Sequence, residues 1–188
     1  MRKIILVSSV SLDGFFEGLD RDISWHVVNE ELLRHFNAQF RATGAFMFGR
    51  VTYELMTDAW PAAGQAPDSS AAMVEFAEIW RDMPKFVFSR TLTRAGSNTT
   101  VIHGVVPEQI AELKARPGGD IVLSGANLAS TFMRYGLVDE FRIYVHPVVL
   151  GQGRPLFEAP DVRANLKLVK TRPFGNGVVL LHYSTHGA

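Results

Sequence analysis

The sequence contains no cysteine among its 188 residues. This absence excludes disulfide bonds, a thiolate nucleophile and metal sites with thiolate ligands. It fits a reducing compartment, so we expect a cytoplasmic protein. The chain also lacks an excess of charge, because nineteen basic residues balance nineteen acidic ones. No global field therefore draws it to nucleic acid or to an anionic membrane, and any anion-binding site must be local.

Long hydrophobic runs are missing as well. The basic and then apolar start, residues 1–10, resembles the beginning of a secretion signal, but serines interrupt it and Asp13 ends it. We interpret residues 3–11 as a buried strand, and no later segment reaches the length of a membrane span. With 47% apolar residues, the chain can bury one substantial core. We predict a single domain over residues 1–188.

Common catalytic and metal motifs are also absent. The six histidines form neither H-x-H nor H-E-x-x-H, so no metal site is expected, and no G-x-S-x-G elbow of a simple hydrolase occurs. We interpret His103 and His146, at predicted strand ends, as structural imidazoles, with a substrate contact as the alternative. Residues 151–153 begin a partial dinucleotide fingerprint but lead into Arg154-Pro155 instead of a helix. They are predicted to form a turn in an extended hairpin that packs against a second subunit.

What is present is a regular alternation of helical and strand patterns. Helices are predicted over 30–40, from 50 onward, and over 73–83, 107–115 and 127–135; strands over 3–11, 45–48, 85–89, 99–103 and 121–124. Residues 60–72 are predicted to be a loop, either a linker or a mobile flap. After residue 140 the pattern changes to an antiparallel hairpin joined through residues 175–177. We predict an α/β fold with a mostly parallel mixed sheet, antiparallel C-terminal strands and flanking helices.

Three predicted strand ends have residues suited to phosphate. They are Gly49-Arg50-Val51-Thr52, Ser89-Arg90-Thr91 and the segment 124–128. In such sheets ligands collect at the carboxyl ends of the strands, where helix N-termini expose free N–H groups. Glycine allows close approach of the backbone, and arginine can bind a phosphate through two parallel hydrogen bonds.

Each of these turns also has an ordinary interpretation. Residues 49–52 can be a simple strand-to-helix turn with a solvated arginine, residues 89–91 a polar turn, and Asn127 a helix cap. Taken together, the three turns favour one ligand with a diphosphate and a separate monoester. NADPH has that shape.

The segments 11–18, 48–54, 89–90, 123–133 and 137–157 together resemble the dihydrofolate reductase superfamily. Within it they are most similar to the reductase domain of bacterial riboflavin biosynthesis. The likeness extends from Lys3 to Tyr183. It implies a three-layer α/β sandwich that binds NADPH across the strand ends and forms a homodimer. Because the first predicted strand starts at residue 3, we expect a stand-alone form of the reductase.

The resemblance also implies roles for individual residues. The implied cofactor-binding residues are Ser9, Val10, Phe16, Gly49, Arg50, Thr52, Ser89, Arg90, Ser124, Gly125, Ala126, Asn127 and Leu128. Ser8 belongs to the same strand beside the nicotinamide. Relatives often have paired glycines where this chain has Gly125-Ala126.

The implied substrate is a small heterocycle of the type of 5-amino-6-(5-phosphoribosylamino)uracil. Asp13, directly after the first strand, is the predicted substrate-facing catalytic residue. Dihydrofolate reduction is an alternative that needs a carboxylate on the first helix, for which Glu30 or Glu31 is the candidate. Both also fit the role of first-turn helix charges. A third possibility is a non-catalytic nucleotide-binding or interaction domain on the same fold.

Overall fold

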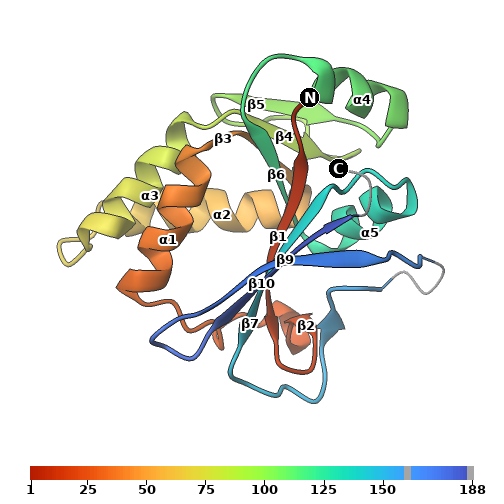
Figure 1. Cartoon of the computed structure of the whole chain (residues 1–188). Helices are drawn as coiled ribbons and strands as arrows, with labels where there is room; N and C mark the ends of the chain where they lie inside the picture. Colours follow the sequence, from red (N-terminus) through yellow and green to blue (C-terminus); the bar gives the residue numbers. More distant parts are fainter. Residues whose placement is uncertain (159–161, 186–188) are drawn as a thin grey trace. The chain divides into compact units, whose positions relative to one another are not determined.

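A computed structural model of the chain describes residues 1–158 and 162–185 (Figure 1). Eight strands hydrogen-bond in the order β5-β4-β3-β6-β1-β7-β10-β9. Their bounds are β1 Ile4–Ser11, β3 Thr43–Gly49, β4 Lys85–Phe88, β5 Thr99–Ile102, β6 Asp120–Ser124, β7 Glu140–His146, β9 Leu166–Pro173 and β10 Val179–Thr185. A second sheet pairs β2, Phe15–Glu17, with β8, Arg154–Pro155.

The helices flank the strands as the sequence predicts. They are α1 Glu30–Arg41, α2 Arg50–Ala63, α3 Ala71–Asp82, α4 Pro107–Ala115, α5 Ala126–Arg134 and the 3-10 turn η1 Leu19–Arg21. In the described part of the chain, no helix has the length and apolar character needed to cross a bilayer.

The chain divides into two compact units. The first comprises residues 1–2 and 29–122, and the second comprises residues 3–28 and 123–188. The prediction of a single domain stays a prediction.

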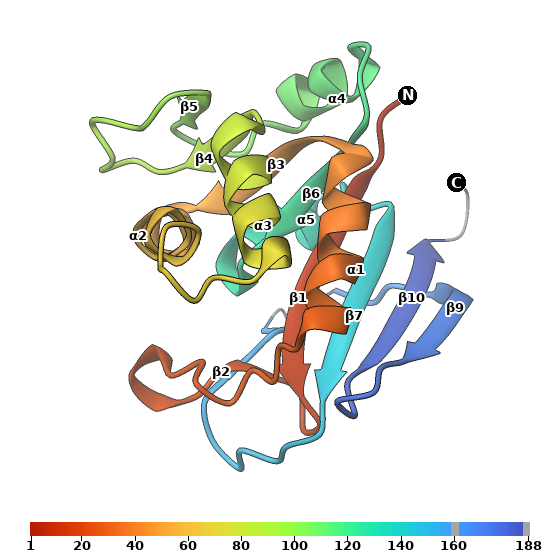
Figure 2. The same cartoon turned by 90° about the vertical axis from the view of Figure 1, so that its left-hand side faces the viewer.

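In the first unit, β3, β4 and β5 are parallel, and aromatic rings fill the core beside them. Phe40 of α1 packs edge-on against Phe46 of β3, and Trp80 of α3 stacks on Phe46 with centroids 6.0 Å apart. Figure 2 shows α1 and α3 side by side. Helix α1 begins where expected, because the Asn29 side chain accepts a hydrogen bond from the Leu32 N–H at 2.9 Å.

The predicted loop over 60–72 was wrong at both ends. Helix α2 continues to Ala63 and includes Pro61 in its last turn, and α3 begins at Ala71 behind the N-cap Ser70. Proline removes one donor, but it does not prevent the turn from closing. The Gly64 N–H still bonds the Trp60 carbonyl at 3.0 Å.

In the second unit, β1 and β7 are parallel, and β7, β10 and β9 follow as antiparallel neighbours. This confirms the predicted C-terminal hairpin, whose turn has Gly177 at a φ of 85°. The large apolar side chains Ile4, Leu6, Phe132 and Tyr144 are fully buried.

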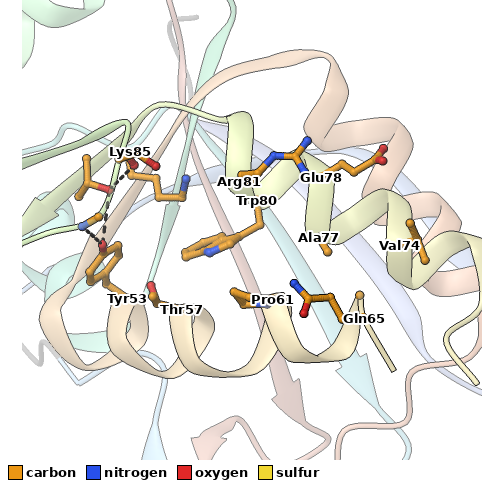
Figure 3. A pocket seen from close by; sticks show the side chains of 14 residues that line it. Tyr53, Thr57, Pro61, Gln65, Val74, Ala77, Glu78, Trp80, Arg81 and Lys85 are labelled. Atoms are coloured by element: carbon orange, nitrogen blue, oxygen red, sulfur yellow. Dashed lines mark hydrogen bonds between the residues drawn. The ribbon is translucent and has the colours of Figure 1, made fainter. Parts of the chain in front are cut away.

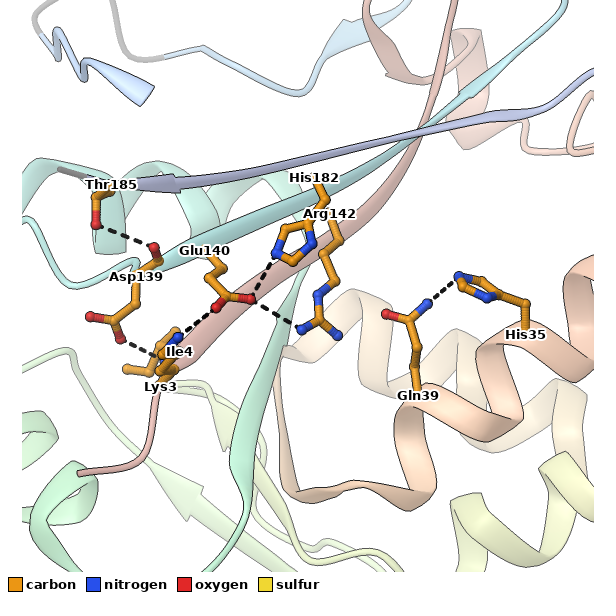
Figure 4. A network of polar contacts seen from close by, with 9 residues as sticks. All are labelled: Lys3, Ile4, His35, Gln39, Asp139, Glu140, Arg142, His182 and Thr185. Carbon is orange, nitrogen blue, oxygen red and sulfur yellow. Dashed lines mark hydrogen bonds and ion pairs between the residues drawn. The ribbon is translucent and has the colours of Figure 1, made fainter. Parts of the chain in front are cut away.

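One acidic side chain in β7 collects three basic partners (Figure 4). Glu140 is 8% exposed and contacts Lys3 at 2.8 Å, His182 at 2.9 Å and Arg142 at 3.1 Å. Burial alone would raise its pKa, but the hydrogen bonds from these partners lower the pKa to about 2. The carboxylate is therefore ionised in the folded protein at neutral pH.

The predicted hairpin turn over 151–153 was also wrong. Arg154 and Pro155 form strand β8, whose partner is β2 and not the preceding strand. Gly153 has a φ of 143°, and a Cβ there would overlap the carbonyl oxygen of Glu17. Glycine is thus needed for this close pairing of two chain segments.

Candidate cofactor and active site

The turn from β3 to α2 leaves backbone donors available. Gly49 is the N-cap of α2, and no side chain caps the helix. A Cβ on Gly49 would meet no atom within 4 Å, so the space in front of this backbone is open. Arg50 is exposed and pairs with Glu54 at 2.7 Å, while Thr52 lies in the first turn. Free N–H groups beside a cation and a hydroxyl can bind a phosphate.

The turn after β4 lies at the same edge of the sheet. In the parallel pair of β3 and β4, Gly49 is the register partner of Phe88, which directly precedes Ser89. The Ser89 hydroxyl oxygen accepts hydrogen bonds from the Thr91 and Leu92 N–H groups at 3.1 and 2.9 Å, so it shapes the turn. Arg90 is exposed. The structure thus brings together two of the three predicted phosphate-binding turns.

The third turn belongs to the second unit, where β6 ends at Ser124 and α5 begins at Ala126. Gly125 is the N-cap, with a φ of 101°, a conformation that only glycine adopts without strain. Ala126 and Leu128 are buried. The alternative interpretation of Asn127 as the helix cap was wrong, because Asn127 lies inside the helix and its side-chain oxygen accepts a hydrogen bond from Arg154.

The strand implied to lie beside the nicotinamide is β1. Ser9 and Val10 are the register partners of Tyr144 and Val145 in parallel β7, close to the carboxyl ends of both strands. Ser8 and Val10 are buried, with 4% and 5% of their surface exposed, and Ser9 is half-buried. Phe16 lies in β2 and is also half-buried.

Asp13 holds two segments together. Its carboxylate accepts hydrogen bonds from the Ser11 hydroxyl at 2.6 Å, the Gly151 N–H at 2.8 Å and the Leu150 N–H at 3.1 Å. These bonds, led by the one from Ser11, lower its pKa to about 2 against a weaker opposing effect of desolvation. Asp13 is therefore ionised at neutral pH and fixes the 150–151 backbone to the end of β1.

Glu30 is engaged in a similar way. Its carboxylate accepts hydrogen bonds from the Ser70 hydroxyl at 2.7 Å and from Arg34 at 3.0 Å, and these two partners lower its pKa. Glu30 and the exposed Glu31 both lie in the first turn of α1, which fits their interpretation as helix charges.

An aromatic cluster in the second unit is the feature that the sequence gave no reason to expect. The rings of His26 and His146 stack with centroids 5.1 Å apart, and Trp25 packs edge-on against both. The Val27 N–H donates to His146 Nδ1 at 3.1 Å. Burial lowers the pKa of each histidine to about 4, so both are neutral at pH 7. His146 is fully buried, but its Nε2 atom has no hydrogen-bond partner within the described part of the chain, so its role as a structural imidazole stays a prediction. His26 lies in an irregular segment that carries no recognisable motif.

No group of three or more histidine, aspartate or glutamate side chains in residues 1–158 and 162–185 could hold a metal ion. The chemistry of the described edges is instead that of anion binding by backbone N–H groups, hydroxyls and arginine.

The mostly parallel sheet, its antiparallel last strands and its flanking helices define a dihydrofolate-reductase-like fold. The chain belongs to the family of the RibD C-terminal domain, whose model matches residues 2–180. The family predicted from the sequence and its fold class are thereby confirmed.

Similar proteins cover nearly the whole chain. The chain is 37% identical to the uncharacterized protein YyaP of Bacillus subtilis strain 168 over 190 residues, which cover 99% of this chain and 96% of YyaP. A solved structure from Shewanella sp. PV-4, provisionally assigned to riboflavin biosynthesis, has a TM-score of 0.76 at 21% identity and covers 97% of this chain and 98% of its own. Dihydrofolate reductase from Enterococcus faecalis, solved with NADP(H), has a TM-score of 0.65 at 14% identity, with 98% and 96% covered.

Proposed function

We propose that the protein is an NADPH-dependent reductase of a small heterocyclic substrate. The substrate type is that of 5-amino-6-(5-phosphoribosylamino)uracil in riboflavin biosynthesis, or a related compound. The observation that carries this proposal is the match to the RibD C-terminal domain over residues 2–180. The likeness to the NADP(H)-bound dihydrofolate reductase supports the fold on which such a cofactor is bound.

The residues of the first unit fit the phosphate groups of NADPH. Gly49 leaves open space before the uncapped start of α2, and Thr52 adds a hydroxyl in its first turn. We assign Arg50 to the same phosphate and Ser89 with Arg90 to the monoester. In the second unit we assign the diphosphate to the start of α5. Gly125 is the N-cap there, with a φ of 101°, and no side chain caps the backbone N–H groups of the first turn.

When bound, NADPH supplies the hydride, so the protein needs to contribute orientation and a dry environment more than reactive side chains. We assign the β1 backbone at Ser9 and Val10, together with Phe16, to the nicotinamide. Asp13 and Glu30 are ionised at neutral pH, so each can accept a hydrogen bond from a substrate N–H but cannot serve as an acid. Because two partners already hold Glu30, no observation favours dihydrofolate over a pyrimidine substrate.

The cofactor assignment is tested by titrating NADPH and NADH into the protein and into the variant Arg90→Ala. We expect the variant to bind NADPH about tenfold to a hundredfold more weakly, the value of a hydrogen-bonded charge contact, with NADH unaffected. The matched control is Arg94→Ala, an exposed arginine four residues further on. If Arg90→Ala weakened the binding of NADPH and NADH equally, or if Arg94→Ala weakened NADPH binding as much, the role assigned to Arg90 would be contradicted.

The activity is tested by the loss of NADPH absorbance with the ribosylamino-pyrimidine and, separately, with dihydrofolate. Turnover of the pyrimidine supports the proposal, and turnover of dihydrofolate alone supports the alternative. Cofactor binding without turnover of any pyrimidine or pteridine would identify a non-catalytic nucleotide-binding domain. Absence of binding for both nucleotides at millimolar concentration would overturn the proposal altogether.

We also propose a cytoplasmic homodimer, as the resemblance to riboflavin-pathway reductases implies. Light scattering of the purified protein tests the assembly, because a dimer has twice the 20.9 kDa mass of one chain. A mass that stays at one chain over the accessible concentration range would refute it.

A further inference from the structure

The first unit contains a pocket of about 320 Å³ between α2 and α3 (Figure 3). This volume is within the usual range for sites that bind small molecules. Tyr53 and Thr57 line it from α2, Trp80 lines it from α3, and Lys85 lines it from the start of β4. Arg90, assigned above to the cofactor, follows the opposite end of that strand. The pocket is therefore separate from the proposed phosphate contacts of this unit.

Lys85 is an unusual residue for a pocket wall because only 4% of its surface is exposed. Its ammonium donates to the Met83 carbonyl at 2.8 Å and lies 4.8 Å from the ring centroid of Trp80. Among the described residues no carboxylate forms an ion pair with it. An ammonium has three donors, so Lys85 retains hydrogen-bonding capacity that an anion in the pocket can use.

Thr57 supplies a second polar group. Its hydroxyl oxygen is buried and has no hydrogen-bond partner within the described part of the chain. Figure 3 shows the Thr57 side chain rising from α2 toward the space that Lys85 enters from β4. The neighbouring Tyr53 hydroxyl, in contrast, already accepts a hydrogen bond from the Gly96 N–H at 2.9 Å. Buried hydroxyls are normally satisfied, so Thr57 indicates a ligand atom at this position.

The charges around the pocket limit the charge of that ligand. The guanidinium of Arg81 is exposed and donates two hydrogen bonds to Asp82, at 2.8 and 3.1 Å, whereas Lys85 is the buried cation of the lining. Glu78 also lines the pocket and adds a negative charge. A second negative charge on the ligand would be repelled by Glu78 and would find no second buried cation in the lining. We therefore expect a ligand with one carboxylate, which pairs with the Lys85 ammonium.

The side chains that line the pocket indicate the chemistry of the rest of the ligand. Trp80 and Tyr53 are aromatic, and Val74, Ala77 and Pro61 add apolar surface. Helices α2 and α3 converge at Gly64, where a Cβ would overlap that of Ala77. The space between the helices is therefore narrow at that end and favours a flat body.

We propose that this pocket binds a small aromatic monocarboxylate. Its carboxylate lies between the Lys85 ammonium and the Thr57 hydroxyl, and its ring packs against Trp80 and Tyr53. The site adds a second ligand class to the protein, and it does not depend on the reductase activity proposed above.

The first experiment compares acids with their neutral amides by titration calorimetry on the unsubstituted protein. We expect benzoate and indole-3-acetate to bind at least tenfold more tightly than benzamide and indole-3-acetamide. Equal binding of acid and amide, or no saturation by either acid at millimolar concentration, would overturn the proposal.

The second experiment uses three variants. Lys85→Met keeps the length and shape of the side chain but removes the charge, and it should weaken indole-3-acetate at least tenfold. Thr57→Val removes the hydroxyl and should weaken it about threefold. Lys167→Met, the same change at an exposed lysine of β9, should have no effect. Unchanged binding of indole-3-acetate by a folded Lys85→Met variant would overturn the proposal. If that variant does not fold, Thr57→Val and the comparison of acid with amide decide the matter.

Discussion

Lys85 should make the protein more stable as the pH rises above neutrality. Burial lowers its pKa from 10.5 to about 8, although Asp82 acts in the opposite direction. Between these two values the unfolded chain holds the proton more firmly than the folded one. The unfolded state therefore binds more protons, and the free energy of unfolding increases with pH.

The size of the effect follows from the two pKa values. From pH 7 to pH 9 the contribution of Lys85 to the free energy of unfolding should rise by about 1 kcal/mol, and from pH 7 to pH 10 by about 2 kcal/mol. Above pH 10.5 the rise ends, because Lys85 is then neutral in both states.

The assay is urea unfolding at several pH values for the protein and for Lys85→Met. Other groups titrate in the same range, but they are shared by both proteins and cancel in the difference. The stability of the unsubstituted protein relative to Lys85→Met should rise with pH by these amounts, from whatever difference the two proteins have at pH 7. Lys167→Met should follow the unsubstituted protein at every pH. A difference between protein and Lys85→Met that stays flat from pH 7 to pH 10 would refute the assignment of a destabilised ammonium.

Three further substitutions test features of the second unit. Glu140→Gln should lower the free energy of unfolding by about 2 kcal/mol at pH 7, measured by urea unfolding. Because the folded pKa of Glu140 is about 2, this loss of stability should shrink as the pH falls from 4.5 toward 2. A loss that stays constant in acid would contradict the role of the ionised carboxylate. Gly125→Ala forces a φ of 101° on a residue with a side chain and should cost about 1–3 kcal/mol in thermal unfolding, whereas an unchanged melting temperature would show a relaxed turn. Asp13→Asn removes a charged acceptor, so hydrogen exchange of the Gly151 amide should accelerate about tenfold or more, and equal exchange would show that the bond is dispensable.

The order of helices and strands was largely predictable because glycine, proline and polar turns separate segments with distinct periodicity. Asn29, for example, caps α1 as expected. The failures have local causes. Pro61 suggested a loop although one lost donor in a last helical turn is tolerated. The pairing of β2 with β8 involves three and two residues, too few to show any periodicity, and depends on a contact that is distant in sequence.

The candidate site was predictable only turn by turn. The sequence pointed to Gly49 and Ser89 separately, and the parallel register of β3 and β4 then placed them at one edge. The buried position of Lys85 could not be foreseen, since a lysine beginning a strand normally extends into water. Its burial results from the Met83 carbonyl and the Trp80 ring, two neighbours that only the folded chain supplies.

The outer edge of β9 has no neighbouring strand among the described residues, so its backbone is open to pairing with another molecule. Exposed Leu168 and Val169 would favour such an addition, but Lys167 and Lys170 flank them. A second copy that paired with this edge would bring the lysine side chains of both copies close together and would remove water from their charged groups. This strand is thereby guarded against fibre-like growth, and a symmetric pair of subunits would more readily use another surface.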